Sequence, residues 1–352
     1  MTNFLVLGSG CGGNFWFNPN ITISTGLLNA AQSTTISVKV TNTAGESVRL
    51  NHVQVTVCAF NTLHSFNSTS ILPSLTSGNG LNWDNVFPFP TDVVIPAGGS
   101  FTVPLNWTPQ TGDIHHFDNV AGAAFENITK TSLHACIFAN CSGSFPPVMT
   151  GAVTDDGTAL SWNSAAFGTF CTDTHHGQHN VSLHRLASQL HIAIPFYAGL
   201  AGGRKSGIAK VFLREATFNP RTDPELLDMI QRAGLGALPI QPAPTPARVA
   251  GLTRFRGAMQ RLEEGLSEAA GEIKEGVEHL MGHWADEDDE NDPQTPRNVL
   301  TLDLSPNSLM PLLLKVAVDK GDPVGAVHVF DVVQSNSDGT RGGFRLATIN
   351  AP

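Results

Sequence analysis

Two runs of the chain between residues 34 and 60 alternate apolar and polar residues. The apolar positions of the first run are Ile36, Val38 and Val40, and those of the second are Val53, Val55 and Val57. Because successive side chains of a strand point to opposite faces, a period of two predicts β-strands with one buried face. The turn NTAGESV joins the runs. We therefore expect an antiparallel pair of strands that covers a second sheet.

The same pattern returns on both sides of the middle of the chain. Residues 92–109 contain a short strand-like run, a glycine turn and a second alternating run, and 132–140 adds another. Strand-like runs follow at 180–219 and again at 298–349, where SNSDGTRGG reads as a hairpin connection. Several short strands separated by turns are typical of β-sandwiches.

A helical pattern interrupts the strands of the second half. Asp223 and Pro224 form a helix start, with Asp as N-cap and Pro at the first helical position. We expect this short helix to end near Gly234, before the proline-rich connector LPIQPAPTPA. From Leu252 to Trp284 apolar residues recur at steps of three and four, which predicts a longer amphipathic helix.

These patterns predict a mainly β fold with two immunoglobulin-like β-sandwich domains, the second with an α-helical insertion. The expected organisation is a flexible lead over residues 1–15, the first sandwich over 16–141, a loop or linker arm over 142–170, and the second sandwich over 171–352, with the insertion at about 222–290.

The N-terminal stretch FLVLGSGCGG matches the glycine fingerprint of dinucleotide-binding folds at Gly8, Gly10 and Gly13. That fingerprint works only where the glycine turn opens a helix. The residues that follow contain Pro19 and several β-branched residues without helical spacing. An acidic residue about twenty positions on is also missing. The sequence therefore favours a glycine-rich lead into a β domain.

The chain is acidic and poor in charged residues, with a net charge of −10 and 14% Asp, Glu, Lys and Arg. Phosphate binding needs clustered Lys and Arg, so no nucleic acid is expected as a partner. No apolar stretch reaches the roughly 20 residues of a membrane span, and membrane contact through the helix at 247–284 is not expected. The N-terminus lacks the charged region and apolar core of a secretory signal.

Histidines gather with a cysteine and an aspartate in CTDTHHGQHNVSLH at 171–184. Zinc prefers these ligand types, and His175, His176 and His179 are the candidate metal ligands. A structural zinc site needs a second ligand pair at a set spacing, which this segment does not supply. A polar turn followed by a strand explains the same residues without a cofactor. A metal-binding protein or metal-dependent enzyme is therefore the alternative reading.

The nucleophile motifs and cysteines of the sequence do not indicate a further functional site. No G-x-S-x-G nucleophile motif is present, so an enzyme is not predicted. The five cysteines are an odd number for a disulfide framework. Cys58 and Cys136 lie in strand-like runs and could be neighbours across a sandwich, where a disulfide or burial as small hydrophobes would both fit.

Several stretches together resemble a family of bacterial modules. WFNPNITI, TTISVKVTNTAGE and VIPAGGSFTVPLNWTP resemble the CARDB-type, immunoglobulin-like adhesion modules of bacterial proteins. HHGQHNVSLH resembles the D-x-H-x-x-Q-x-N segment that follows such a module in uncharacterised bacterial proteins, and VGAVHVFDVVQ with the later GGF resembles their closing strands. The resemblance implies a binding or assembly role with no catalytic residues.

We therefore expect a non-catalytic structural or binding module, a subunit of a surface-exposed or multi-component bacterial assembly such as a fibre, appendage or adhesin. Its partners would be further copies, other protein subunits or carbohydrate, and its place extracellular or in an exported assembly. The candidate contact residues, where exposed, are Trp16, Trp83, Trp107 and Trp162. Trp is highly buried on average, so at least two of these are expected in a core.

Overall fold

The two alternating runs form strands of different sheets in the computed structural model. β3 (Thr34–Asn42) pairs antiparallel with β1 (Leu5–Val6), β2 (Ile21–Ile23) and β7 (Ser100–Trp107). β4 (Val48–Ala59) pairs antiparallel with β5 (Leu81–Asn82), β6 (Val94–Ile95) and β8 (Ala135–Ser144), and β8 pairs with β9 (His176–His179). The two sheets form the first sandwich.

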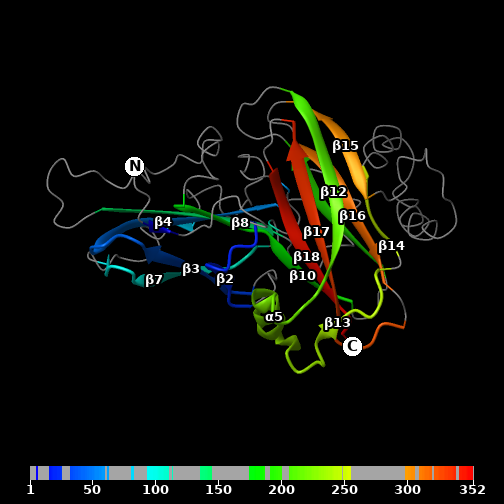
Figure 1. The fold of residues 1–352 in the computed structure, drawn as a ribbon, viewed down its shortest axis with the longest axis horizontal. Helices are drawn as coiled ribbons and strands as arrows, with labels where there is room; N and C mark the ends of the chain where they lie inside the picture. Colours follow the sequence, from blue (N-terminus) through cyan, green and yellow to red (C-terminus); the bar gives the residue numbers. More distant parts are fainter. Residues whose placement is uncertain are drawn as a thin grey trace.

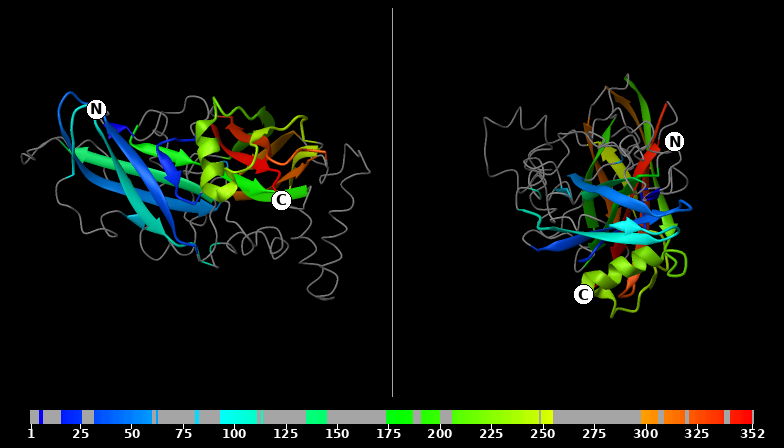
Figure 2. Two further views of the ribbon diagram at one scale, coloured as in Figure 1. Left: turned by 90° about the horizontal axis from the view of Figure 1, so that it is seen from below. Right: turned by 90° about the vertical axis from the view of Figure 1, so that its left-hand side faces the viewer.

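The structure describes residues 5–6, 16–25, 32–59, 62, 81–82, 93–110, 113, 135–144, 174–186, 191–199, 206–247, 249–254, 298–305, 309–318, 321–337 and 341–351. Within these ranges the chain is mainly β, as the sequence predicts (Figure 1). Figure 2 shows the two sandwiches end to end along the long axis of the molecule, with the helix at the border between them.

The expected pairing between residues 34–42 and 48–59 was wrong, because the turn between them crosses from one sheet to the other. Asn42 lies at this corner and is fully buried. Its Nδ2 donates to the carbonyls of Glu46 and Ile95, both at 2.9 Å, and its Oδ1 accepts from the N–H of Ala44 at 2.8 Å. These bonds satisfy backbone groups that a hairpin would have satisfied by strand pairing.

The buried face of each alternating run lines the core of the first sandwich. Ile36, Val38 and Val40 of β3 are 0% exposed and pack against the equally buried Val53 and Val55 of β4. The period of two therefore identified the correct inward residues, although it assigned the strands to the wrong partners.

The second sandwich packs a larger sheet against a smaller one. The larger sheet runs in the order β10 (Val181–Arg185), β18 (Arg341–Ile349), β17 (Ala326–Asn336), β12 (Gly207–Thr217) and β15 (Val299–Leu304), and β13 (Gln241–Pro242) also pairs with β17. The smaller sheet contains β11 (His191–Gly199), β16 (Leu309–Ala317) and β14 (Val249–Arg254). Phe196 and Phe344 meet edge to face between the sheets, with ring centroids 4.9 Å apart.

A short helical element covers the outer face of the larger sheet at the end near the first sandwich. α5 (Pro224–Ile230) begins at Pro224 as predicted and continues into η4 (Gln231–Leu235), where Gly234 has φ = 76°. The buried side chains of the helix pack on the sheet residues Val329 and Ile349. Apolar burial therefore holds the helix, as expected for one far too short to be stable alone.

The structure differs from the expected domain limits at three points. Leu5 and Val6 form a strand within the expected lead, and β9 joins a sheet of the first sandwich although it lies beyond residue 171. Within the expected insertion, residues 249–254 are strand β14. Most of the predicted amphipathic helix lies outside the described residues, and no helix among the described ones is long and apolar enough to cross a membrane.

The buried cysteines occupy one sheet rather than facing each other across the sandwich. Cys58 of β4 lies directly opposite Cys136 of β8, and Cys141 lies further along β8. None of these three forms a disulfide with another described cysteine, and all three are buried. Cys11 and Cys171 lie outside the described residues.

Replacing Gly343 with Ala is expected to destabilise the fold. A Cβ at Gly343 would lie 2.6 Å from the carbonyl oxygen of Val332 and 3.1 Å from the ring of Trp16, which rests on β18 from the first sandwich. We expect a loss of about 1–3 kcal/mol in the free energy of unfolding, measured in urea. Gly45→Ala is the matched control, because a Cβ there meets nothing within 4 Å. Equal stability of the two variants would contradict the packing described.

Candidate functional site

The segment 16–18 runs beside residues 178–180 and ties the first sandwich to the second. The N–H of Asn180 donates to the carbonyl of Trp16 at 2.7 Å, and the N–H of Asn18 donates to the carbonyl of Gln178 at 3.2 Å. The N–H of Arg345 then donates to the carbonyl of Asn180 at 2.8 Å. Backbone hydrogen bonds thus continue from one sandwich into the other.

The residues of the D-x-H-x-x-Q-x-N segment lie at the same junction. His175, Gln178 and Asn180 are all buried. The side-chain Nδ2 of Asn180 donates to the carbonyl of Gly343 at 3.1 Å. The polar residues of this segment therefore lie inside the join between the sandwiches, where their neighbours are protein groups.

An ion-pair network lies beside the junction. Asp331 of β17 is 0% exposed, and Arg345 of β18 holds it with two bonds, from Nε to Oδ1 at 2.7 Å and from Nη2 to Oδ2 at 3.0 Å. Arg214 of β12 donates to the same Oδ2 at 2.8 Å. The three residues are direct partners in the registers of adjacent strands.

Arg345 also joins two further elements to this network. Its Nη1 lies 3.2 Å from Oδ1 of Asp223, and its guanidinium carbon lies 5.4 Å from the ring centroid of Phe17. Asp223 precedes the first helical residue as predicted, but its side chain makes no hydrogen bond to the helix. Its carboxylate is used by Arg345 and by the N–H of Asn219 instead.

A cleft of about 250 Å³ opens where the two sandwiches meet the helix. Its walls come from the segment at β2, from β9 and from α5. The lining residues are Pro19, Ile21, Thr22, Ile23, His179, Pro224, Glu225, Asp228, Met229 and Arg232. The lining combines aliphatic side chains with three charged ones and one histidine.

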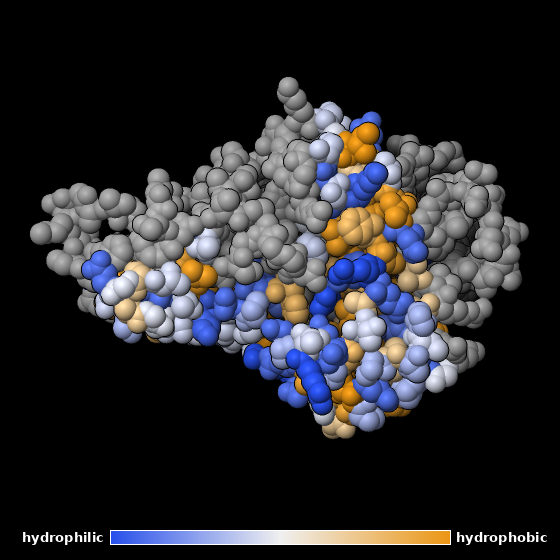
Figure 3. Space-filling model, in the orientation of Figure 1, coloured by the Kyte–Doolittle hydropathy of each residue, from blue (hydrophilic) through white to orange (hydrophobic). Residues whose placement is uncertain are grey.

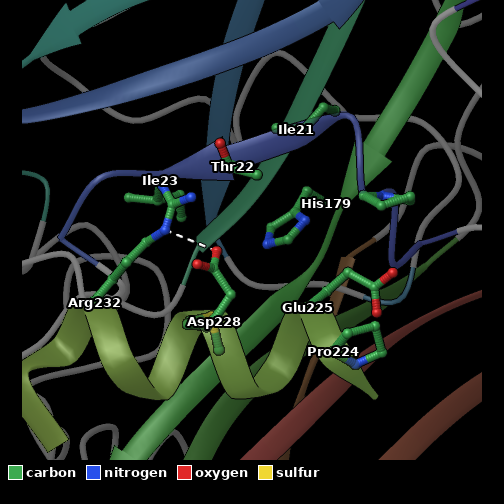
Figure 4. A pocket seen from close by; sticks show the side chains of 10 residues that line it. Ile21, Thr22, Ile23, His179, Pro224, Glu225, Asp228 and Arg232 are labelled. Carbon is green, nitrogen blue, oxygen red and sulfur yellow. Dashed lines mark ion pairs between the residues drawn. The ribbon is translucent and has the colours of Figure 1, made fainter. Parts of the chain in front are cut away.

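His179 lies between β2 and α5, with the carboxylate of Asp228 on one side of it and that of Glu225 on the other in this view (Figure 4). Its Nδ1 is 3.2 Å from the carbonyl of Asn18 and donates to it. Burial lowers the pKa of His179 from 6.5 to about 4, although the bond to Asn18 opposes that effect. At neutral pH the imidazole is therefore uncharged, and Nε2 is a hydrogen-bond acceptor.

One face of the continuous helical element α5–η4 supplies the charges of the cleft. Glu225, Asp228 and Arg232 follow each other at steps of three and four and so share a helix face. Nε of Arg232 pairs with Oδ2 of Asp228 at 2.7 Å. With two carboxylates, one guanidinium and a neutral imidazole, the cleft carries a net negative charge.

A second buried charge cluster lies on the face of the larger sheet opposite the helix. Nδ1 of His328 lies 3.0 Å from Oε1 of Glu215, and its Nε2 lies 2.8 Å from Oδ2 of Asp322. Both oxygens of Glu215 also accept from the N–H of Ala247. Burial disfavours the charged ring, but the hydrogen bonds and charges of the two carboxylates outweigh it and raise the pKa of His328 above 6.5.

The candidate contact tryptophans divide between the core and undescribed parts of the chain. Trp16 is 3% exposed and Trp107 is 5% exposed, so both are core residues. Their position leaves little surface for a partner. Trp83 and Trp162 lie outside the described residues.

The candidate metal ligands are not brought together around one point. Among the described residues, no group of three or more His, Cys, Asp or Glu side chains is arranged to hold a metal ion. His175 lies in the turn before β9, and His179 is the last residue of that strand. His176 lies opposite Asn140 in the pairing of β9 with β8.

Sequence reasoning missed Asp331, Arg345 and His328. A signal existed for two of them, because VHVFDVV places a histidine and an aspartate inside an apolar strand. Such residues are rarely buried without partners. Their partners follow only from the strand registers, which the sequence pattern does not supply.

Comparisons with known proteins add distant similarities only. No protein-family model matches the chain, and no curated protein matches it. Among solved structures it is similar to the CupB6 tip adhesin from Pseudomonas aeruginosa, at 9% identity over 99% of this chain and 98% of that one, with a TM-score of 0.21.

Two other solved structures show similarity at the same level. MSCRAMM ACE of Enterococcus faecalis is 8% identical over 94% of both chains, with a TM-score of 0.18. Red sea bream transglutaminase is 11% identical over 93% of this chain, with a TM-score of 0.19, and this chain spans 31% of its length. TM-scores this low give no support for a shared function.

Replacing Arg345 with Gln is expected to cost about 3–5 kcal/mol of unfolding free energy, because it leaves the carboxylate of Asp331 buried beside a single cation. Arg214→Gln removes another partner of the same carboxylate, but the Arg214 side chain is 60% exposed. That change should cost at most about 1 kcal/mol. Urea unfolding of both variants tests this, and similar losses would contradict the assigned roles.

The charge on His328 should make the fold less stable in mild alkali. A histidine whose folded pKa lies above 6.5 stabilises fully below pH 6.5, and this contribution is lost as the pH rises through the folded value. Urea unfolding from pH 6.5 upward should show this loss, and His328→Gln should flatten it. His179 and His184, whose pKa values are lowered, act only below pH 6.5. An unchanged profile in the variant would refute the assignment.

Proposed function

We propose that the protein is a non-catalytic structural module, and that copies of it associate through the edge strand β15 as part of a surface-exposed or multi-component bacterial assembly. The observation that carries this proposal is the edge of the larger sheet in the second sandwich that the described strands leave unpaired. β15 is the last strand of that sheet, and no described strand pairs with its outer side.

The register of β15 fixes which backbone groups face outward. The N–H of Leu213 donates to the carbonyl of Asn298, directly opposite it across the ladder. Inward and outward groups alternate along an antiparallel strand. The N–H and carbonyl groups of Val299 and Asp303 therefore point away from β12, toward an incoming strand.

The exposed side chains around this edge include two large apolar ones beside the charged Lys210 and Asp303. Val299 is 52% exposed, and Ile208 of the neighbouring β12 is 54% exposed. Figure 3 shows hydrophobic surface over β12 and β15 on this face. Exposed apolar surface of this kind commonly marks an interaction site.

β7, an edge strand of the first sandwich, is by contrast protected against pairing. Pro104 lies in the middle of β7 and has no N–H to offer to another strand. β15 contains neither proline nor lysine. Of the two edges, β15 is therefore better suited to pairing.

A second copy of the chain fits this edge by symmetry. Two β15 strands can pair antiparallel in a register that places Val299 of each copy opposite Asp303 of the other. That register brings no like charges face to face, which is the arrangement that would weaken the pair. Two-fold dimers of this kind are the commonest protein assembly, because one surface serves both subunits.

The experiment is light scattering after size exclusion, over a range of protein concentrations. The wild-type chain should form dimers or larger species, and Val299→Asp should shift it to monomer because it places a carboxylate opposite Asp303 of the other copy. Asp303→Pro should have the same effect, since it removes an outward N–H and leaves the ladder to β12 intact. The matched control is Val94→Asp, a similarly exposed valine at 43% on β6.

Two results would contradict the proposal. One is a wild-type chain that stays monomeric at every concentration. The other is a wild-type oligomer that Val299→Asp and Asp303→Pro leave intact.

A further inference from the structure

We propose that the cleft between β2 and α5 binds a primary alkylammonium group, either a lysine side chain of a partner protein or a free amine. This site is separate from β15 and does not depend on the assembly proposed above. It rests on His179, on the charged face of α5 and on the aliphatic walls between them.

His179 is the observation that points to a ligand. It is 6% exposed, so the ring is more than nine-tenths buried, and its Nδ1 is already used by the carbonyl of Asn18. Nε2 has no partner among the described residues and faces the cleft (Figure 4). Because this atom faces the cleft, a ligand that donates a hydrogen bond there can provide its missing partner.

The other polar groups that the cleft leaves available are also mainly acceptors. Glu225 makes no hydrogen bond or ion pair with the described residues, and Asp228 uses only Oδ2 for Arg232. Together with Nε2 of His179 they give three acceptor positions. A primary ammonium carries three N–H donors and no acceptor, which matches a cleft whose available polar groups are mainly acceptors.

The net negative charge of the cleft also favours a cation. Arg232 neutralises one of the two carboxylates, and the uncharged ring of His179 adds no positive charge. The carboxylate of Glu225 is left as the excess charge. Hydrogen bonds between an ammonium and a carboxylate are about twice as strong as those between neutral groups, so an amine gains more here than an alcohol.

The walls and the volume of the cleft limit the size and the polarity of the rest of the ligand. Pro19, Pro224 and Met229 give the cleft aliphatic surface on which an alkyl stem can lie. About 250 Å³ corresponds to roughly eight waters of liquid volume. This is room for one side chain or a small molecule, and a folded peptide segment would not fit.

The experiment is calorimetric titration of the full chain at neutral pH and low salt. n-Pentylammonium chloride should bind saturably, while 1-pentanol, which has the same stem without the charge, should bind at least tenfold more weakly. Ac-Gly-Lys-Gly-NH₂ separates the two sources of the ammonium. Comparable or tighter binding of this peptide indicates a partner's lysine, and binding of the free amine alone indicates a small molecule.

Substitutions of the lining residues test whether the amine binds in this cleft. Glu225→Gln and Asp228→Asn should each weaken n-pentylammonium binding roughly tenfold. Glu46→Gln removes a carboxylate from an exposed turn of the first sandwich and should change nothing. The ¹⁵N resonance of His179 Nε2, assigned with His179→Gln, should move on titration as it accepts a hydrogen bond.

Val299→Asp should bind the amine as the wild type does, which separates this proposal from the assembly through β15. The proposal is overturned if 1-pentanol binds as well as n-pentylammonium, or if sodium propionate binds in its place. It is also overturned if Glu225→Gln and Asp228→Asn leave the affinity unchanged.

Discussion

The pairing of Arg345 with the buried Asp331 is the constraint that organises the outer face of the larger sheet. Asp331 is fully buried in the middle of the larger sheet, and a carboxylate there is tolerable only with a cation held in good geometry. Arg345 provides it and, with the rest of its guanidinium, reaches Asp223 ahead of α5 and Phe17 of the first sandwich. One side chain thus joins the sheet, the helix and the neighbouring domain.

The sequence predicted the class of fold and the buried face of most strands, but not which strands are partners. Alternation at Val38 and Val55 reports that each strand has a core side, and it does so equally whether the two strands share a sheet or face each other. Asn42 decides between these two arrangements, because its side-chain amide donates to the carbonyl of Ile95, more than fifty positions away. A contact between residues so far apart in the chain cannot be predicted from a local alternation of apolar and polar residues.

The candidate site was visible in part. The sequence singled out His179 for metal binding, and the spacing of Glu225, Asp228 and Arg232 can be read as one helix face. The acceptor role of His179 could not be predicted, because it depends on a bond to the carbonyl of Asn18, 161 positions away. Burial and one fixed donor turn a potential metal ligand into a neutral acceptor. Residue type alone therefore does not determine the chemistry.

The outer face of the larger sheet is divided by the row of Arg214, Asp331 and Arg345. On one side of that row α5 and η4 cover the apolar residues, and the helix surface that remains outside forms the cleft. On the other side no described element covers β12 and β15, and Ile208 and Val299 stay exposed. The row therefore separates the part of the outer face that the helix covers from the part that the described residues leave exposed.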